Sequence, residues 1–116
     1  MLTLYGIGSC DTCGKARTWL TAQSYDYHFH DLRDDGLDIK MLERWAKRIH
    51  WEKLLNTRSL TWRKLPEVDR ADMSRDRALT SMLEHPTLVK RPVLECSKFI
   101  AVGFSPENYR AIFMQL

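Results

Sequence analysis

Leu2 to Leu20 read LTLYGIGSCDTCGKARTWL, and this stretch decides the fold. Apolar and polar side chains alternate from Leu2 to Ile7, which predicts a strand, and the Gly-x-Ser that follows predicts a turn. From Asp11 to Thr21 the apolar residues recur at helical spacing, and the acidic residue in the first turn suits the helix dipole. The stretch therefore predicts a strand followed by a helix, with Cys10 and Cys13 where the two meet.

The sequence that follows predicts a second strand and then a helical region. Tyr25 to Asp31 alternates aromatic and polar residues as a half-buried strand does. Asp38 is placed as the N-cap of a helix that reaches about Ile49, and Trp51 to Leu55 predicts a further helical turn. Asn56 to Leu60 is polar and predicted to be irregular. Ser74 is placed to cap a helix over Arg75–Glu84.

The last part of the chain returns to sheet. Val93–Glu95 and Phe99–Val102 are predicted to form an antiparallel hairpin, because a short turn separates two strand-like segments. Ser105 followed by a proline is typical of a helix start and predicts a C-terminal helix. The predicted order is β-α-β, then helices, then β-β-α.

Composition narrows the class of protein. The chain has 116 residues, 44% hydrophobic and 28% charged, and a net charge of +3, which fits one globular domain. The charges alternate in sign and form no basic stripe, so we expect no nucleic-acid partner. No segment is long and apolar enough for a membrane span, and no secretory leader precedes the first strand. We expect a cytoplasmic protein, a monomer, without a membrane partner.

The pair of cysteines carries the predicted chemistry. Backbone N–H groups and the positive end of a helix dipole stabilise a thiolate, so Cys10 is the predicted nucleophile. Cys13 lies one turn further along the same helix face and is the predicted resolving thiol, which attacks a mixed disulfide formed at Cys10. Lys15 and Arg17 either add positive potential there or are solvated helix charges.

No metal site is expected, because the CxxC pair has no second pair of ligands at structural-zinc spacing. The histidines of the second strand are interpreted as surface or sheet-edge residues, and His50 and His85 as partners of helix dipoles. Cys96 is interpreted as a small apolar filler or an incidental exposed thiol.

Pro92 opens a strand directly after Arg91. In a thiol-redox fold such a proline, often cis, faces the reactive cysteine and shapes the edge where substrate binds. Arg91 would then lie beside the sulfur, where its fork of donors can hold a thiolate or an oxyanion. The alternative for Arg91 is an ordinary surface arginine.

The chain resembles, over essentially its whole length, the arsenate reductase related (ArsC/Spx) family, and within it the YffB subgroup. The resemblance implies an α/β, thioredoxin-like fold: a mixed four-stranded sheet, built as βαβ plus ββα, with an all-helical insertion between strands 2 and 3. It implies a core of about residues 1–33 and 86–116 and an insertion of about 34–85. The resemblance rests on these segments: Leu4-Tyr5-Gly6, Cys10-Asp11-Thr12, Lys15-Ala16-Arg17, Leu54–Arg58, Thr61–Leu65, Lys90-Arg91-Pro92 and Gly103-Phe104-Ser105.

The resemblance also implies roles for individual residues. Family arsenate reductases use one cysteine, matched by Cys10, and three arginines, of which Arg58 and Arg91 are matched here. The third arginine position holds Phe104, which cannot hydrogen-bond an arsenate oxygen.

The YffB resemblance implies glutathione as reductant or co-substrate, with no bound cofactor. Arg58 and Arg91, with Arg63 or Lys64, would hold its carboxylates, and Pro92 would shape the cleft. The expected function is a glutathione-dependent thiol–disulfide reductase acting on a disulfide or an oxyanion. The alternatives are an Spx-like redox-switched regulator that binds RNA polymerase and a true arsenate reductase.

Overall fold

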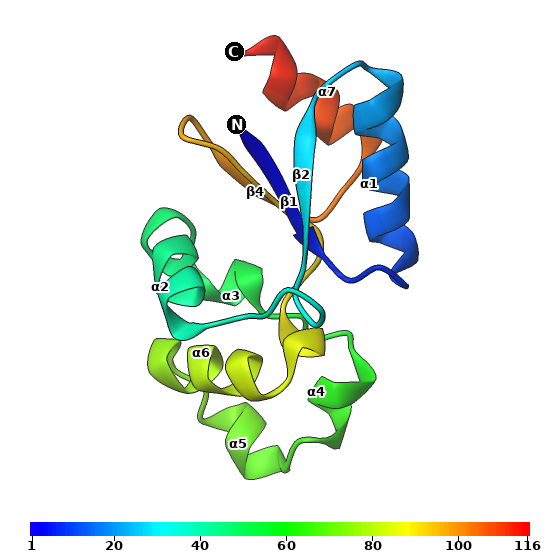
Figure 1. Ribbon diagram of the computed structural model, residues 1–116. Helices are drawn as coiled ribbons and strands as arrows, with labels where there is room; N and C mark the ends of the chain where they lie inside the picture. Colours follow the sequence, from blue (N-terminus) through cyan, green and yellow to red (C-terminus); the bar gives the residue numbers. More distant parts are fainter. The chain divides into compact units, whose positions relative to one another are not determined.

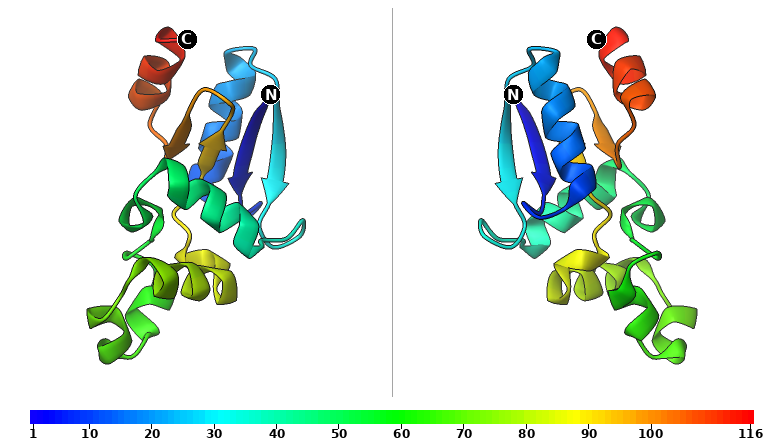
Figure 2. Two further views of the ribbon diagram at one scale, coloured as in Figure 1. Left: turned by 90° about the vertical axis from the view of Figure 1, so that its left-hand side faces the viewer. Right: turned by 90° about the vertical axis from the view of Figure 1, so that its right-hand side faces the viewer.

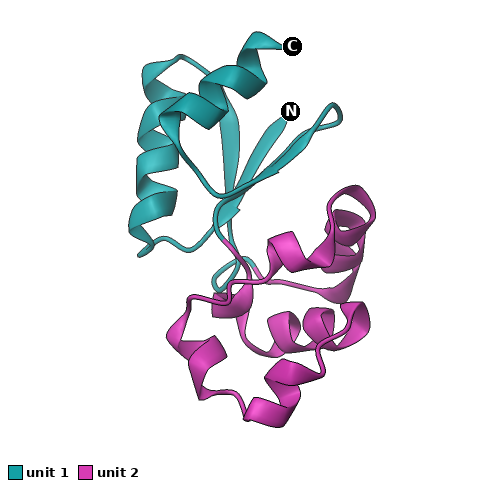
Figure 3. Ribbon diagram, turned by 180° about the vertical axis from the view of Figure 1, so that it is seen from behind, with its two compact units in different colours: residues 1–35, 91–116 teal, residues 36–90 magenta.

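A computed structural model describes all 116 residues, and they divide into two compact units. Unit 1 comprises residues 1–35 and 91–116, and unit 2 comprises residues 36–90 (Figure 3). The sequence placed the corresponding boundaries at about 33/34 and 85/86, and the expectation of a single domain stays a prediction. None of the helices combines the length and the apolar run that crossing a membrane requires.

Unit 1 holds the whole sheet. Its strands are β1 (Leu2–Gly6), β2 (Tyr27–Asp31), β3 (Val93–Glu95) and β4 (Ile100–Val102), in the order β2-β1-β3-β4 (Figure 1). β1 pairs with β2 in parallel, whereas β1 with β3 and β3 with β4 pair antiparallel. The mixed four-stranded sheet of the predicted βαβ and ββα parts is confirmed.

Two helices complete unit 1, α1 (Asp11–Ala22) and α7 (Pro106–Met114). Both pack on the same face of the sheet, as the two views of Figure 2 show. The core between the sheet and the helices is fully apolar except for one phenol, and it consists of Leu4, Ala16, Leu20, Leu94, Ala101 and Tyr109. Burial of this face, which the sequence pattern predicts, fixes α1 on the sheet and with it the start of the helix.

Unit 2 is helical, as predicted. It contains α2 (Ile39–Arg48), α3 (Trp51–Leu54), α4 (Leu60–Lys64), α5 (Glu67–Ala71), α6 (Arg75–Glu84) and the 3₁₀ helix η1 (Pro86–Leu88). α6 contacts α2, α3 and η1. The chain leaves α3 through Leu55, which forms an isolated bridge with Val89.

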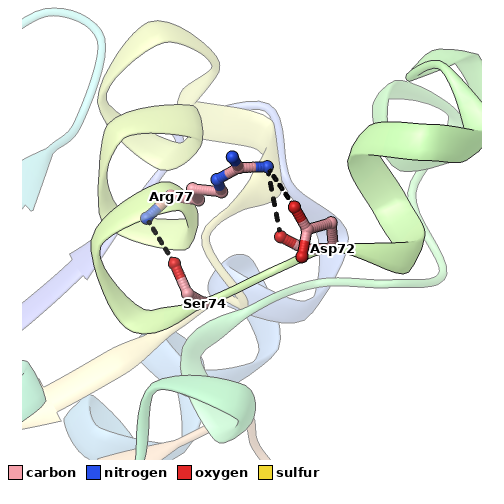
Figure 4. Close-up of polar contacts among 3 residues, drawn as sticks. All are labelled: Asp72, Ser74 and Arg77. Atoms are coloured by element: carbon pink, nitrogen blue, oxygen red, sulfur yellow. Dashed lines mark hydrogen bonds and ion pairs between the residues drawn. The ribbon is translucent and has the colours of Figure 1, made fainter.

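Capping residues begin the longer helices where the sequence places them. Asp38 accepts a hydrogen bond from the Met41 N–H at 2.9 Å at the start of α2. Ser74 accepts one from the Arg77 N–H at 3.3 Å at the start of α6, and Arg77 also pairs with Asp72 (Figure 4). The Arg77–Asp72 pair is exposed and contributes little to stability, so the cap defines the helix start.

The structure corrects some sequence interpretations. Leu60, assigned to an irregular segment, begins α4, and neither α4 nor α5 was predicted. β2 begins at Tyr27, two residues later than expected, and Ser24 in the turn after α1 has a φ of 61°. His50 is the N-cap of α3, and its Nδ1 accepts a hydrogen bond from the Glu52 N–H at 3.3 Å; its role as a helix-dipole partner stays a prediction.

Candidate functional site

Cys10 lies between the end of β1 and the first turn of α1. It occupies the N-cap position of α1 with extended backbone angles, and its side chain makes no capping hydrogen bond. Its N–H donates to the carbonyl of Ile7 and its carbonyl accepts from the N–H of Gly14, both at 3.0 Å. The backbone is therefore fixed on both sides of Cys10, while the half-buried sulfur remains available for reaction.

Asp31 holds the loop that leads to Cys10. This buried carboxylate, at the end of β2, accepts a hydrogen bond from the Gly8 N–H at 2.8 Å through Oδ2. Its Oδ1 accepts from the N–H groups of Arg33 at 2.8 Å and Asp34 at 3.0 Å. The Asp34 hydrogen bond lowers the pKa of Asp31 most, against the effect of burial, and Gly8 and Arg33 lower it further. Sequence reasoning did not select Asp31 as a site residue.

The surroundings of Cys10 favour its thiolate. Partial burial opposes ionisation, but the Cys13 N–H, the Cys13 thiol and the Arg91 guanidinium all hydrogen-bond the sulfur. The positive charge of Arg91 adds to their effect, and the pKa of Cys10 is lowered below its usual range. The structure places Cys10 as a half-buried thiol with a lowered pKa, and its role as the nucleophile stays a prediction.

Cys13 has the opposite character. Its side chain is 1% exposed, and burial raises the pKa of its thiol to about 12, partly offset by a hydrogen bond from the Ile7 N–H. The neighbouring Cys10 raises the pKa of Cys13 further and Arg91 lowers it. A thiol that stays protonated can donate a hydrogen bond to a thiolate, and at this place Cys13 is also near enough to attack a disulfide at Cys10.

Arg91 and Pro92 belong to the same unit as the two cysteines, directly before β3. The Arg91–Pro92 peptide bond is cis, and Pro92 is buried, with its carbonyl accepting from the Gly103 N–H at 2.8 Å. Arg91 interacts with Cys10 by hydrogen bond and by charge. The structure thus brings together the three predicted catalytic residues, Cys10, Cys13 and Arg91.

The other predicted binding residues lie in unit 2. Arg58 is exposed, and its N–H donates to Oδ1 of Asn56 at 3.2 Å in the turn before α4. Arg63 and Lys64 are exposed residues in the last turn of α4. Their predicted role in holding substrate carboxylates stays a prediction.

Several further residues have identifiable surroundings. Arg17 lies over the ring of Phe29 at 4.1 Å and donates to the Tyr27 hydroxyl at 3.3 Å, which places it against β2. Phe104, at the position where family arsenate reductases are expected to have an arginine, packs edge-on against Tyr109 at 4.7 Å between ring centroids. No group of three or more His, Cys, Asp or Glu side chains is arranged to hold a metal ion.

We expect Asp31→Asn to destabilise the protein by about 1–3 kcal/mol at neutral pH. In wild type both carboxylate oxygens accept hydrogen bonds from backbone N–H groups. In the variant the amide NH₂ replaces one of these oxygens in either orientation, so that two donors face each other. Because the folded-state pKa of Asp31 is lowered, its stabilisation is complete above the unfolded value of about 3.9 and is lost as pH falls through the folded value. Urea unfolding of both proteins between about pH 7 and pH 2 checks this, and a constant difference across that range would contradict it.

We expect Arg91→Met to raise the pKa of Cys10, because the variant loses both a hydrogen bond and a positive charge beside the sulfur. Methionine keeps most of the apolar stem, so packing changes little. Ultraviolet absorbance of the thiolate against pH measures the shift. Arg17→Met is the matched control, since Arg17 contacts Phe29 and Tyr27, and an equal pKa change in both variants would assign the effect to net charge.

The fold and the site define a protein of thioredoxin-like architecture with a thiol of lowered pKa at a helix start. The model of the ArsC family matches residues 5–112. The chain therefore belongs to the ArsC family, and the resemblance inferred from its motifs is confirmed.

Individual relatives agree with this assignment. The solved structure of a YffB protein is 43% identical, with a TM-score of 0.89, and the match covers 96% of this chain and 97% of that one. An arsenate reductase related protein from Brucella melitensis is 47% identical, with a TM-score of 0.81, covering 97% and 93%. The global transcriptional regulator Spx of Lactiplantibacillus plantarum is 29% identical over 112 residues, 95% of this chain and 84% of the regulator.

Proposed function

We propose that this protein is a glutathione-dependent thiol–disulfide reductase of the cytoplasm, with Cys10 as its nucleophile. The observation that carries the proposal is the half-buried Cys10 sulfur at the start of α1, whose pKa is lowered by Cys13 and Arg91. An accessible thiolate is the group that attacks disulfides, and a lowered pKa increases the fraction of Cys10 present as thiolate.

The reaction begins when the Cys10 thiolate attacks one sulfur of a disulfide substrate. A new S–S bond forms at Cys10, the substrate S–S bond breaks, and the departing thiolate takes a proton from water. Arg91 holds Cys10 as a thiolate before the attack, and Pro92 shapes the cleft beside it. The binding of glutathione carboxylates by Arg58, Arg63 and Lys64 of unit 2 stays a prediction of the sequence.

Two routes return Cys10 to the thiolate. Cys13 loses its proton and attacks the Cys10 sulfur, which releases the reduced substrate and leaves an internal disulfide; two glutathione molecules then reduce this bond and leave as oxidised glutathione. Alternatively, glutathione attacks the mixed disulfide directly. The closeness of Cys13 to Cys10 supports the first route, and the burial of Cys13 supports the second.

The proposal is tested by trapping the intermediate. After incubation with oxidised glutathione, mass analysis of Cys13→Ser is expected to find one glutathione on Cys10, and wild type is expected to contain an internal disulfide. Wild type should also reduce hydroxyethyl disulfide with glutathione as the electron source. Absence of both the adduct and the turnover would refute the proposal.

A second function is favoured by the similarity to Spx together with the CxxC pair. In this alternative the Cys10–Cys13 disulfide switches binding to RNA polymerase, and the protein is a regulator. Pull-downs with oxidised and with reduced protein distinguish the two functions, because a switch retains polymerase in one redox state only. Arsenate reduction is less well supported, since Phe104 offers no donor to an arsenate oxygen.

A further inference from the structure

A groove that the thiol chemistry leaves unused begins at the residue after Cys10. It lies in unit 1 between α1 and the start of α7, and most of its lining surface is apolar. Trp19, Phe104 and Pro106 supply the apolar part. The groove begins within one helical turn of Cys10, because Asp11 follows it in the chain and the N–H of Gly14, a lining residue, donates to the Cys10 carbonyl at 3.0 Å.

Small residues follow Cys10 along α1 at intervals of four. Gly14, Thr18 and Ala22 all line the groove, and residues four apart lie on one side of a helix. The rise of about 1.5 Å per residue gives this row a length of about 12 Å, which corresponds to roughly four residues of extended chain. The groove therefore has the dimensions of a short peptide segment.

Packing within this chain does not require a glycine at position 14. Glycine inside a helix costs about 0.5–1 kcal/mol relative to alanine. A Cβ at Gly14 would meet no heavy atom within 4 Å, whereas a Cβ at Gly6 would lie 2.5 Å from Sγ of Cys13. Packing explains the glycine at position 6 but not the one at position 14, where its absent side chain leaves the helix backbone open to close approach from outside.

The charges that line the groove indicate which class of ligand it binds. Asp11 and Lys15 are the charged residues of its lining, and they balance each other. Glutathione carries two carboxylates and one ammonium group and is a net anion, and the balanced charges of this lining offer no excess of positive charge to attract it. An apolar side chain of a polypeptide matches the lining of Trp19 and Phe104 better.

We propose that this groove binds a polypeptide segment whose cysteine is the sulfur attacked by Cys10, with an apolar side chain next to that cysteine. The inference rests on the proposed thiol–disulfide function and adds the substrate class, a protein disulfide. The Cys10 thiolate attacks the sulfur of the docked cysteine, the bond to the other sulfur breaks, and that sulfur leaves as a thiolate. The docked segment remains linked to Cys10 until Cys13 or glutathione releases it.

The test uses two peptides that differ only beside their cysteine. Each cysteine is disulfide-linked to thionitrobenzoate, a good leaving group, so that Cys10 attacks the peptide sulfur and releases a coloured thiolate. One peptide has leucine on both sides of the cysteine, and the other has the similarly sized but polar asparagine. We expect wild type to react about tenfold faster with the leucine peptide in single-turnover experiments, because a leucine side chain gains about this much from partial burial.

Gly14→Gln fills the groove with a flexible polar side chain, and we expect it to reduce the tenfold preference to about twofold or less. Thr21→Gln is the matched control: it adds the same side chain to an exposed position of α1 outside the groove and should keep the preference. Thermal unfolding of both variants verifies that they are folded.

Equal rates with the two peptides in wild type, or the same preference in Gly14→Gln as in wild type, would overturn the groove assignment. The readout is the first half-reaction and contains no glutathione. A preserved preference without glutathione-dependent turnover would therefore refute the proposed function alone. A Cys10 that reacts with neither peptide would refute both.

Discussion

Cys10→Ser is expected to lose at least about 10³-fold of the disulfide-cleaving rate at neutral pH. Serine is not ionised there, and no other thiol replaces Cys10. Cys13 is buried, and burial is the largest cause of its raised pKa, so Cys13 stays largely protonated at neutral pH even without Cys10. Release of a chromogenic thiolate in a single turnover measures the rate directly.

Two controls make the Cys10 result specific. Cys96→Ser should react at the wild-type rate, because Cys96 lies in the turn between β3 and β4, where its N–H donates to the Phe99 carbonyl. Cys13→Ser should keep the first half-reaction and lose the internal disulfide. If Cys10→Ser retained more than about a tenth of the wild-type rate, the nucleophile would have to be another group.

Gly6→Ala is expected to destabilise the protein by about 1–3 kcal/mol, the range found when a well-packed core is overfilled. A Cβ at Gly6 would lie 2.5 Å from Sγ and 3.2 Å from Cβ of Cys13. Since Cys13 sits in the first turn of α1, the clash also displaces the thiol that donates to Cys10. Urea unfolding measures the stability, and the thiolate absorbance of Cys10 shows whether its pKa rises.

A double-mutant cycle isolates the Gly6–Cys13 contact. In Cys13→Ala the sulfur is absent, so adding Gly6→Ala should then cost clearly less than it does in wild type. Gly14→Ala is the opposite control, because its new Cβ meets nothing and the helix gains about 0.5–1 kcal/mol. Equal effects of alanine at positions 6 and 14 would show that the Cys13 contact is unimportant.

The sequence predicts the parts of the fold whose residues follow a regular pattern. The cap at Asp38 and the apolar stripe behind it define α2, and Ser105 with Pro106 defines α7. α4 and α5 escaped prediction because neither short helix contains a buried residue, so neither has an apolar stripe to reveal it. The start of α4 depends on one local contact, the Ser59 side chain accepting from the Trp62 N–H at 3.1 Å, and α5 begins after Pro66 without a side-chain cap.

In the candidate site, too, the residues marked by a local sequence pattern could be predicted and those brought in by distant contacts could not. Cys10 and Cys13 are recognisable because their spacing and their place at a helix start are local in sequence. Arg91 was indicated by the proline after it, and its contact with Cys10 became visible only in the folded chain. The role of Asp31 could not be predicted from the sequence, because its hydrogen bond to Gly8 joins residues 23 positions apart. No local pattern marks an acidic residue at the end of a strand as the partner of a distant loop.

The pKa of Cys13 depends on whether Cys10 is a thiolate or has reacted. While Cys10 is a thiolate, its charge raises the pKa of Cys13, and Arg91 is engaged with Cys10. Once Cys10 forms a mixed disulfide, that charge is gone, and the positive charge of Arg91 is left to favour ionisation of Cys13. In the proposed reaction the pKa of Cys13 is therefore expected to fall once Cys10 has reacted, although its burial is unchanged, so that binding of the substrate favours its own release.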